Sequence, residues 1–341
     1  MASEAPPFWW GKPDWRAHSL TPLSWVYGAV AGRRLLNAEP PKIAAPVLCI
    51  GNFTVGGAGK TPTAIAFAKA AKERGLAPGI VSRGYGGDYK GLHIVDPSND
   101  SARHVGDEPL LLARHAPVAL CPDRLKSAQA LLACGCDFII MDDGFQSARL
   151  HTDFALLVVD STRGIGNGKV IPAGPLRAPL TDQMRKTDAL LRIGKGSEAD
   201  YVVRQASRAG RPVYDAQLIP SSLAEVAGNR WLPFAGIGNP TKFFASVRQA
   251  GGEIVETRTF PDHYPYTAAD IEELRDRARH LGVSLITTAK DQVRLITTQN
   301  LPRSFARELA ILDVELDFDR QDAINLIINT AIARFKARNA A

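Results

Sequence analysis

The chain has 341 residues, 45% of them hydrophobic and 22% charged, a globular composition that excludes a disordered, collagen-like or coiled-coil protein. At ~150 residues per domain, this length predicts about two domains. The net charge of +6 suits an anionic ligand or an anionic membrane surface, and we expect no nucleic-acid partner and no obligate protein partner.

The N-terminal 40 residues are unusually rich in tryptophan. Four of the five tryptophans lie in the first 25 residues, and the uncharged stretch Ser19–Gly32 ends at Arg33 and Arg34. This stretch is shorter than the ~20 apolar residues of a membrane span, and the mixed charges before it do not fit a signal peptide. Its helical spacing predicts a helix that either lies at a membrane interface or packs on the protein's own core. The tryptophans favour the membrane, so we expect residues 1–40 to form a peripheral interface helix.

The four cysteines form no Cys-x-x-Cys pair and no zinc-ligand pattern. Free thiols in apolar runs behave as small hydrophobic residues. They indicate a reduced, cytosolic setting, which places the expected membrane contact on the cytoplasmic face.

Between residues 41 and 200, apolar runs alternate with helical patterns, as in an α/β fold. The runs are continuous, which predicts a mostly parallel sheet with helices on both faces. We expect strands at Val47–Ile50, Gly79–Ser82, Val118–Cys121, Phe138–Met141, Phe154–Val159 and Ala189–Ile193, and helices at Thr63–Arg74, Pro109–His115 and Leu125–Cys134. The Gly- and Pro-rich stretch Gly164–Leu180 is expected to be an ordered functional loop or lid.

From about Gly194 to Gln217 the pattern weakens, and we expect this stretch to cross between domains. Residues 201–341 are expected to form a smaller C-terminal α/β domain. Its predicted strands are Trp231–Ile237, Ile254–Thr257, Val283–Thr287 and Leu309–Glu315, and its predicted helices are Thr241–Ala250, Ala268–Leu281 and Gln321–Arg338.

The strongest chemical signal lies between the first strand and the first helix after residue 40. It is a glycine-rich loop whose members are Thr54, Val55, Gly56, Gly57, Ala58, Gly59, Lys60 and Thr61. Glycines let backbone N–H groups approach phosphate oxygens, the lysine neutralises phosphate charge, and the threonine hydroxyl can bind Mg²⁺. Thr54 stands where the strict pattern has glycine, so we expect a variant loop. The sequence therefore predicts a P-loop NTPase-like domain at 41–200 that binds a nucleotide with Mg²⁺.

Two adjacent carboxylates, Asp142 and Asp143, follow the apolar strand Phe138–Met141. At the carboxyl end of a strand beside the phosphate loop, such residues can reach Mg²⁺ directly or through water. The next residues, Gly144 to Gln146, are expected to turn the chain at the edge of the site.

Two further residues could accept a proton from a substrate hydroxyl. Asp107 and Glu108 open a predicted helix, where acidic residues also simply complement the helix dipole. His263 lies in a stretch that could be a plain turn. A kinase acting on a hydroxyl needs a carboxylate or an imidazole near the acceptor oxygen. Asp107 and His263 both qualify, and the residues alone leave the choice open.

Arginines in loops at predicted strand ends could hold phosphate groups, although a solvated surface residue is the commoner case. The candidates are Arg83, Arg124 and Arg177. Each lies where the ligand crevice of an open α/β sheet is found.

Together these patterns resemble the tetraacyldisaccharide 4'-kinases of lipid A biosynthesis. The matching stretches are Gly51–Thr61, Ser82–Gly87, Gly106–Pro109, Asp142–Gln146, Pro172–Arg177, Ala235–Pro240, Phe260–His263 and Thr287–Asp291. The resemblance implies ATP- and Mg²⁺-dependent phosphorylation of the 4'-hydroxyl of a tetraacyldisaccharide 1-phosphate at the inner membrane. It also implies Asp107 as base with His263 assisting, Lys60 on phosphate, and Thr61, Asp142 and Asp143 at the metal. We expect substrate contacts from Arg83, Glu108, Arg124, Gln146 and Arg177.

Three positions depart from the family's usual residues: Ser147 replaces a frequent histidine, while Ala178 and Ala289 each replace a frequent glutamate. None of the three is a group that the chemistry requires. The main alternative is a variant P-loop NTPase that acts as a switch or metallochaperone, and another is a kinase or ligase with a soluble acceptor. Neither alternative needs a membrane-contacting N-terminus.

Overall fold

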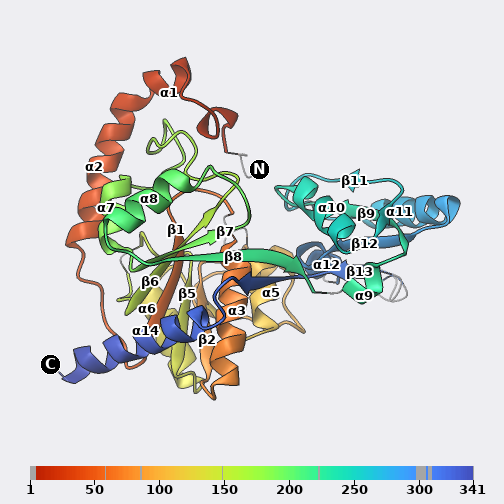
Figure 1. Ribbon diagram of the computed structural model, residues 1–341. Coiled ribbons are helices and arrows are strands. Elements are labelled where there is room, and N and C mark those ends of the chain that lie inside the picture. The colour runs from red at the N-terminus through yellow and green to blue at the C-terminus, as the bar shows by residue number, and fades with distance from the viewer. Residues whose placement is uncertain are drawn as a thin grey trace.

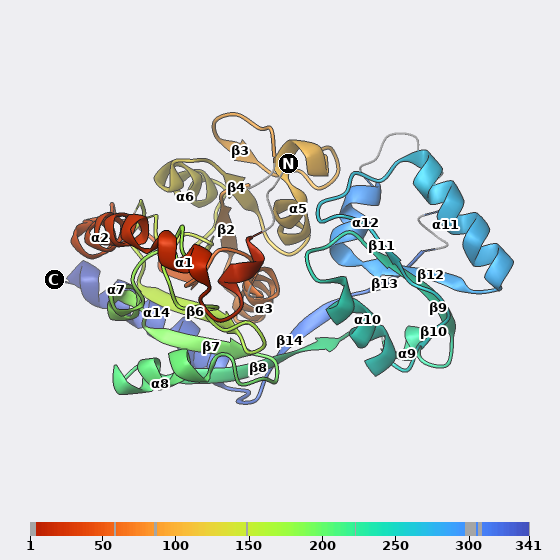
Figure 2. The same cartoon turned by 90° about the horizontal axis from the view of Figure 1, so that it is seen from above.

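The computed structural model describes residues 5–57, 59–84, 87–147, 149–221, 223–296, 305 and 309–340. Figures 1 and 2 show two α/β lobes side by side, with the C-terminal helix returning to the larger lobe. The α/β fold with a mostly parallel sheet is confirmed.

The larger lobe is built on a sheet that, within the described residues, has nine strands in the order β14-β8-β7-β6-β1-β5-β2-β4-β3. Only the edge strands β3 and β14 run antiparallel to their neighbours. The strands are β1 (Val47–Asn52), β2 (Pro78–Ser82), β3 (His93–Ile94), β4 (Val118–Leu120), β5 (Phe138–Asp142), β6 (Phe154–Asp160), β7 (Ala189–Ile193), β8 (Val213–Pro220) and β14 (Val314–Phe318).

Helices cover both faces of this sheet, as the continuous apolar runs predicted. Along β1, Leu48 and Ile50 join one core while Val47 and Cys49 join the other. One face packs on α3 (Lys60–Glu73), α5 (Asp107–Ala113) and α14 (Ala323–Ala340), and the other on α6 (Arg124–Ala133), α7 (Leu180–Lys186) and α8 (Asp200–Arg208). The short helix α4 (Ala102–Val105) directly precedes α5.

The smaller lobe has a five-stranded parallel sheet of its own among the described residues. Its strands are β9 (Arg230–Ala235), β10 (Glu253–Ile254), β11 (Arg258–Thr259), β12 (Ser284–Thr288) and β13 (Leu309–Leu312). Its helices are α9 (Leu223–Val226), α10 (Pro240–Gln249), α11 (Ala268–Leu281) and α12 (Ala289–Ile296). Helix α12 contributes Val293 to the core of the larger lobe and Leu295 to that of the smaller.

Several predicted boundaries in the second half were wrong. The stretch from Gly194 to Gln217 holds α8 and most of β8, so the crossover is β8 itself, which runs on towards the smaller lobe (Figure 1). The predicted strand Leu309–Glu315 breaks at Asp313 into β13 and β14, which belong to different sheets. Of the predicted strand Ile254–Thr257, only Ile254 lies in a strand, at the end of β10, and β11 begins just after it at Arg258. Because β8, β14 and α14 belong to the larger lobe, the division between the sheets does not fall at residue 200.

The N-terminal helices lie on the outside of the larger lobe, and the last and longest of them runs along the flank away from the smaller lobe (Figures 1 and 2). They are η1 (Pro7–Trp9), α1 (Trp15–Ser19) and α2 (Thr21–Asn37). Helix α2 rests on the ordered stretch Gly164–Leu180: the Ala173 amide donates to Ser24 Oγ at 2.9 Å, and Trp9 Nε1 donates to the Pro172 carbonyl at 3.0 Å. In the part of the chain that the structure describes, no helix combines the length and the apolar character needed to cross a membrane.

Candidate active site

The phosphate-binding loop follows β1 and ends at α3. Its backbone is tied to the neighbouring Pro175–Arg177 segment, because the Val55 amide donates to Pro175 at 2.9 Å and the Arg177 amide donates to Phe53 at 3.0 Å. Lys60 Nζ lies 3.3 Å from the Gly56 carbonyl oxygen. The Pro175–Arg177 segment therefore fixes the backbone of the loop, and the Lys60 side chain lies against the Gly56 carbonyl of the same loop.

Gly59 explains why this turn needs glycine. Its φ is +90°, and a Cβ there would stand 2.6 Å from Ile193 Cδ1 at the end of β7. The next residues begin α3, and Pro62 falls in the first turn, where a missing N–H costs nothing. The first amides of α3 are thus presented at the loop, as in helix-terminal anion sites.

Asp142 closes β5 beside this loop and is only 3% exposed. Burial raises its pKa to about 7, with Glu108 adding to the effect and Lys60 opposing it. Its Oδ1 is buried and has no hydrogen-bond partner among the described residues. Thr61, at the start of α3, is buried as well. An unpartnered carboxylate oxygen and a threonine hydroxyl at one loop are oxygen donors of the kind Mg²⁺ prefers, so these residues fit the ion.

Asp143 organises the polar side chains around the loop. Its two carboxylate oxygens accept from Arg177 at 2.6 and 2.9 Å, Lys60 Nζ lies at 3.8 Å, and its carbonyl accepts from Arg124 Nη2 at 3.1 Å. Burial raises the pKa of Asp143, but the charges of Lys60 and Arg177 outweigh burial and the net pKa is lowered. Asp143 is therefore held as an anion at a positive φ of 51°.

Gln146 fixes the turn that follows Asp143. Its Nε2 donates to the Asn52 carbonyl at 2.7 Å and to Gln183 Oε1 at 2.9 Å, while its Oε1 accepts from Arg177 at 3.3 Å. The structure thus brings the predicted residues Arg124, Gln146 and Arg177 together around one carboxylate.

The two proton-acceptor candidates meet across the lobes. His263, on the loop after β11, has its Nδ1 2.8 Å from Asp107 Oδ2 at the start of α5. Arg294 of α12 donates through Nε to the same Oδ2 at 2.7 Å. Burial raises the pKa of Asp107, yet the hydrogen bond from His263 and the Arg294 charge outweigh it and lower the net pKa. The bond to Asp107 raises the pKa of His263.

A second ion pair also joins α12 to the first turn of α5. Lys290 Nζ of α12 lies 2.7 Å from Glu108 Oε1 of α5. The Lys290 charge lowers the pKa of Glu108, to which the Lys60 charge also contributes. Since Glu108 acts electrostatically on Asp142 as well, the first turn of α5 lies within electrostatic range of the phosphate loop.

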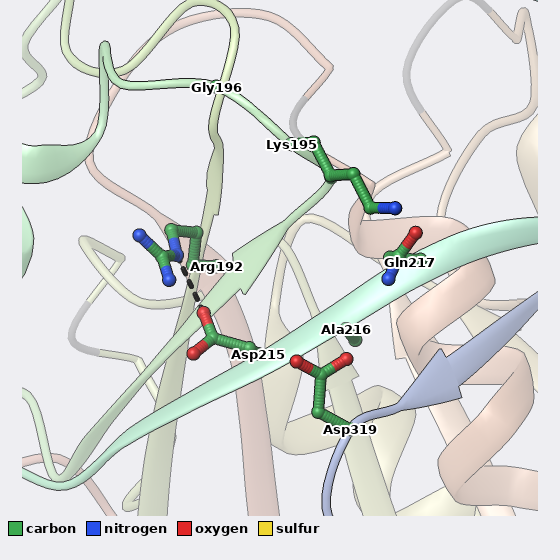
Figure 3. Close-up of a pocket in the computed structure, with 8 residues that line it drawn as sticks. Arg192, Lys195, Gly196, Asp215, Ala216, Gln217 and Asp319 are labelled. Carbon is green, nitrogen blue, oxygen red and sulfur yellow. Dashed lines mark hydrogen bonds and ion pairs between the residues drawn. The ribbon is translucent and has the colours of Figure 1, made fainter.

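A cleft of about 190 Å³ opens at the carboxyl end of β7, beside the middle of β8. Figure 3 shows Lys195 on the loop after β7, Gln217 on β8, and Arg192 joined to Asp215. The Arg192–Asp215 pair measures 2.6 Å. Because Ile193 touches the phosphate loop and Gly194 lines the cleft, the cleft continues the phosphate site. Sequence analysis did not single out these residues.

One predicted residue, Arg83, takes no part in these contacts. Arg83 is exposed on the loop after β2, and its carbonyl accepts from the Tyr89 hydroxyl. Ala58 lies outside the described residues.

Sequence reasoning gave no role to Arg294 or Lys290. The Thr287–Asp291 stretch pointed to this region, but nothing local shows that α12 faces Asp107. The available signal was the pair of cations at i and i+4 within one short helix.

Comparisons with known proteins agree over nearly the whole chain. Residues 16–333 match the family model described as tetraacyldisaccharide-1-P 4'-kinase. Curated proteins named tetraacyldisaccharide 4'-kinase are 73% identical in Brucella anthropi and 70% identical in Brucella ovis, each over 99% of both chains. A crystal structure of LpxK from Aquifex aeolicus in complex with ATP superposes with a TM-score of 0.74 at 26% identity, covering 93% of this chain and 99% of that one.

Proposed function

The chain belongs to the tetraacyldisaccharide-1-P 4'-kinase family, and from that membership we propose which of its residues carry out each part of the reaction. The protein is an ATP-dependent kinase of lipid A biosynthesis that transfers the γ-phosphate of ATP to the 4'-hydroxyl of tetraacyldisaccharide 1-phosphate. Family membership decides against the switch and metallochaperone alternatives.

The phosphate loop and the first amides of α3 hold the triphosphate, with Lys60 as the cation beside it. Thr61 and Asp142 are the residues that would hold Mg²⁺, and Asp143 orients this edge of the site through Arg177 and Lys60. Bound there, Mg²⁺ supplies positive charge against the phosphate oxygens. The unpartnered Oδ1 of Asp142 supports this assignment.

The cleft beside β7 and β8 receives the nucleobase. It lies outside the carboxyl end of the parallel strand β7, adjoins the phosphate loop through Ile193, and offers both polar side chains and the Lys195 stem. We expect Lys195→Ala to raise KM for ATP while leaving KM for the lipid unchanged. A parallel change in both constants would argue against this placement.

Asp107 accepts the proton of the 4'-hydroxyl, and His263 shares that proton. The two groups are hydrogen-bonded, so their titration belongs to the pair. Phosphoryl transfer passes through a loose transition state, in which orienting the hydroxyl matters more than a strong base. A carboxylate with a lowered pKa therefore suffices when it is fixed in place, and Arg294 fixes it.

The acceptor headgroup lies between these two groups of residues. Glu108 and the Arg124, Gln146 and Arg177 set line the phosphate-loop side, and the exposed Arg83 offers a cation at its rim. We propose that these five residues bind the headgroup of the disaccharide 1-phosphate, with the arginines directed at its phosphate and Glu108 and Gln146 at its sugar hydroxyls, and with Arg124 and Arg177 acting through the Asp143 turn.

Helices α1 and α2 dock the enzyme on the cytoplasmic face of the inner membrane. On α2, the small residues Ser24, Gly28 and Gly32 face the protein. Of the large apolar residues, Leu35 near the end of the helix is buried, whereas those of the preceding turns face outward, with exposures of 72% for Trp25 and 67% for Val26. This arrangement reverses that of a helix packed on a core, and the exposed Arg33 and Arg34 suit anionic lipid.

The hydrogen bond between His263 and Asp107, which joins the two lobes beside the phosphate loop, carries this assignment. Its test is mass spectrometry of the lipid product from Lys60→Ala and Asp107→Asn enzymes. We expect each variant to lose about 100-fold or more in rate. Lys72→Ala, an exposed lysine on the same helix as Lys60, is the matched control and should retain the wild-type rate. Full activity in either active-site variant would contradict the assignment.

A further inference from the structure

Three metal-ligating side chains converge outside the active site, in the segment between β2 and α5. His93, Asp100 and His104 each offer a ligand atom, and these atoms lie within 4.8 Å of one another. His93 Nε2 is 2.7 Å from Asp100 Oδ2, and the two imidazole rings stand edge to face with centroids 5.2 Å apart. No step of the proposed reaction uses these three residues.

A fourth polar group, the carboxylate of Asp88, is hydrogen-bonded to one of these three residues. Asp88 Oδ1 lies 2.9 Å from His104 Nδ1. A carboxylate on one ring nitrogen of a histidine commonly fixes the ring so that the other nitrogen can bind a metal. Two neutral imidazoles and the carboxylates of Asp88 and Asp100 carry a total charge of −2, which matches a divalent cation.

The local fold offers little other support for the segment. It contains the two-residue strand β3 and the four-residue helix α4. Val95 and Val105 are buried, but Leu92 and Ile94 remain 47% and 39% exposed. Small units with a poor apolar core are often stabilised by a bound metal, because binding free energy adds directly to folding free energy.

We propose that His93, Asp100 and His104 form a site for a divalent transition metal, with Zn²⁺ the ion that fits best. Two imidazole nitrogens and one carboxylate oxygen are a typical zinc ligand set, with solvent completing a tetrahedron. Mg²⁺ prefers oxygen ligands alone, so this site is chemically distinct from the one at Asp142.

A metal bound at this site would act on the connection between α4 and α5. His104 belongs to α4, whose last residue is followed by Gly106, the N-cap of α5, and then by Asp107. A metal that joins His104 to β3 would therefore stiffen the turn that leads into α5. Metal binding itself does not depend on the roles proposed for Asp107 and His263.

The test is a calorimetric titration of the full-length, tag-free protein, stripped with a chelator, with ZnCl₂ alone. We expect one zinc ion per chain. Loss of a partner behind a ligand costs about 10–100-fold in metal affinity, so loss of a ligand itself in His104→Gln or Asp100→Asn should cost at least as much. His280→Gln, an exposed histidine on α11, is the matched control and should bind zinc like the wild type. Circular dichroism establishes that each variant is folded.

A second measurement separates this site from adventitious binding. Zinc should raise the unfolding temperature of the wild type and of His280→Gln, because a ligand that binds only the folded state stabilises it, and should not raise that of His104→Gln. The proposal is overturned if the wild type binds no zinc, or if folded His104→Gln and Asp100→Asn bind zinc as tightly as the control.

Discussion

Burial of the Asp142 carboxylate destabilises the folded protein, and the same carboxylate is the proposed ligand of Mg²⁺. Its carboxyl is buried beside Glu108 and Asp143, so its pKa rises to about 7. A group whose pKa is higher in the folded state favours folding at low pH, and that contribution is lost as the pH rises through 7. Above that pH the protein keeps a buried charge that only a bound cation would compensate.

Asp142→Asn should therefore stabilise the metal-free protein at pH 8 while abolishing activity. The gain in the free energy of unfolding is up to about 4 kcal/mol, at ~1.4 kcal/mol per unit of pKa. Asp143→Asn is the matched comparison and should destabilise, because the pKa of Asp143 is lowered and its ion pair with Arg177 would be lost. Thermal unfolding at pH 8 without Mg²⁺ measures both changes. A lower unfolding temperature for Asp142→Asn would refute the argument.

His263 should titrate above its ordinary value of 6.5 in the wild-type protein. Its bond to Asp107 raises its pKa, so the contribution of that bond to stability is complete below pH 6.5 and fades as the pH rises through the raised pKa. In Asp107→Asn the partner carries no charge, and the pKa of His263 should fall. Imidazole proton NMR across pH 5 to 9 follows this directly, and an unchanged His263 titration in the variant would count against the pair.

The phosphate loop was predictable residue by residue, whereas the surroundings of Asp107 were not. Thr54 to Thr61 are consecutive residues, proposed to act through their backbone and through the side chains of Lys60 and Thr61, so their pattern is local. Arg294 reaches Asp107 from 187 residues away, and this contact depends on how the two lobes dock. The sequence could name Asp107 and His263 as candidates, but their hydrogen bond is a property of the tertiary structure.

At the level of elements, the strands β1, β2, β4, β5, β6 and β7 of the larger lobe were predictable because each buries a nearly continuous apolar run. The partly buried strand β8 shows no such run and was not predicted. Helix α12 was missed because the side chains it buries include Asp291 and Arg294. These charges are paired with each other at 3.0 Å, and they share the buried side of this short helix with Ala289 and Val293, so the sequence does not show which side is buried. The break at Asp313 was also hidden, since apolar residues lie on both sides of it.

The outward face of α2 gives a prediction at this scale. Trp25→Glu should weaken binding to anionic vesicles and raise KM for the lipid substrate about tenfold, while leaving ATP binding unchanged, because Trp25 is 72% exposed and anchors at the headgroup level. Tyr201→Glu places the same charge on a 51% exposed aromatic of α8 and is the control. Co-sedimentation with anionic vesicles measures the binding of both variants. Equal binding by the two would argue that α2 does not contact the membrane.

At the scale of the whole molecule, the two lobes supply different residues of the proposed active site. The larger lobe supplies the phosphate loop, Asp142 and Asp107, while the smaller lobe supplies His263, and α12 bridges both cores. The strands β8 and β14, which pair antiparallel, join the larger sheet to the smaller lobe. Nucleotide binding should therefore need only the larger lobe, while phosphate transfer should need both.

The most direct test measures transfer of label from γ-³²P-ATP to tetraacyldisaccharide 1-phosphate by His263→Ala, alongside the affinity of the same protein for ATP. General acid–base groups contribute about 10²–10⁴-fold to rate, so labelled lipid should form at least 100-fold more slowly. Affinity for ATP should stay within about twofold of the wild type, since His263 makes no hydrogen bond or ion pair with the described residues of the phosphate loop. Wild-type labelling by His263→Ala, or a loss of ATP affinity in proportion to the loss of labelling, would contradict the two-lobe mechanism.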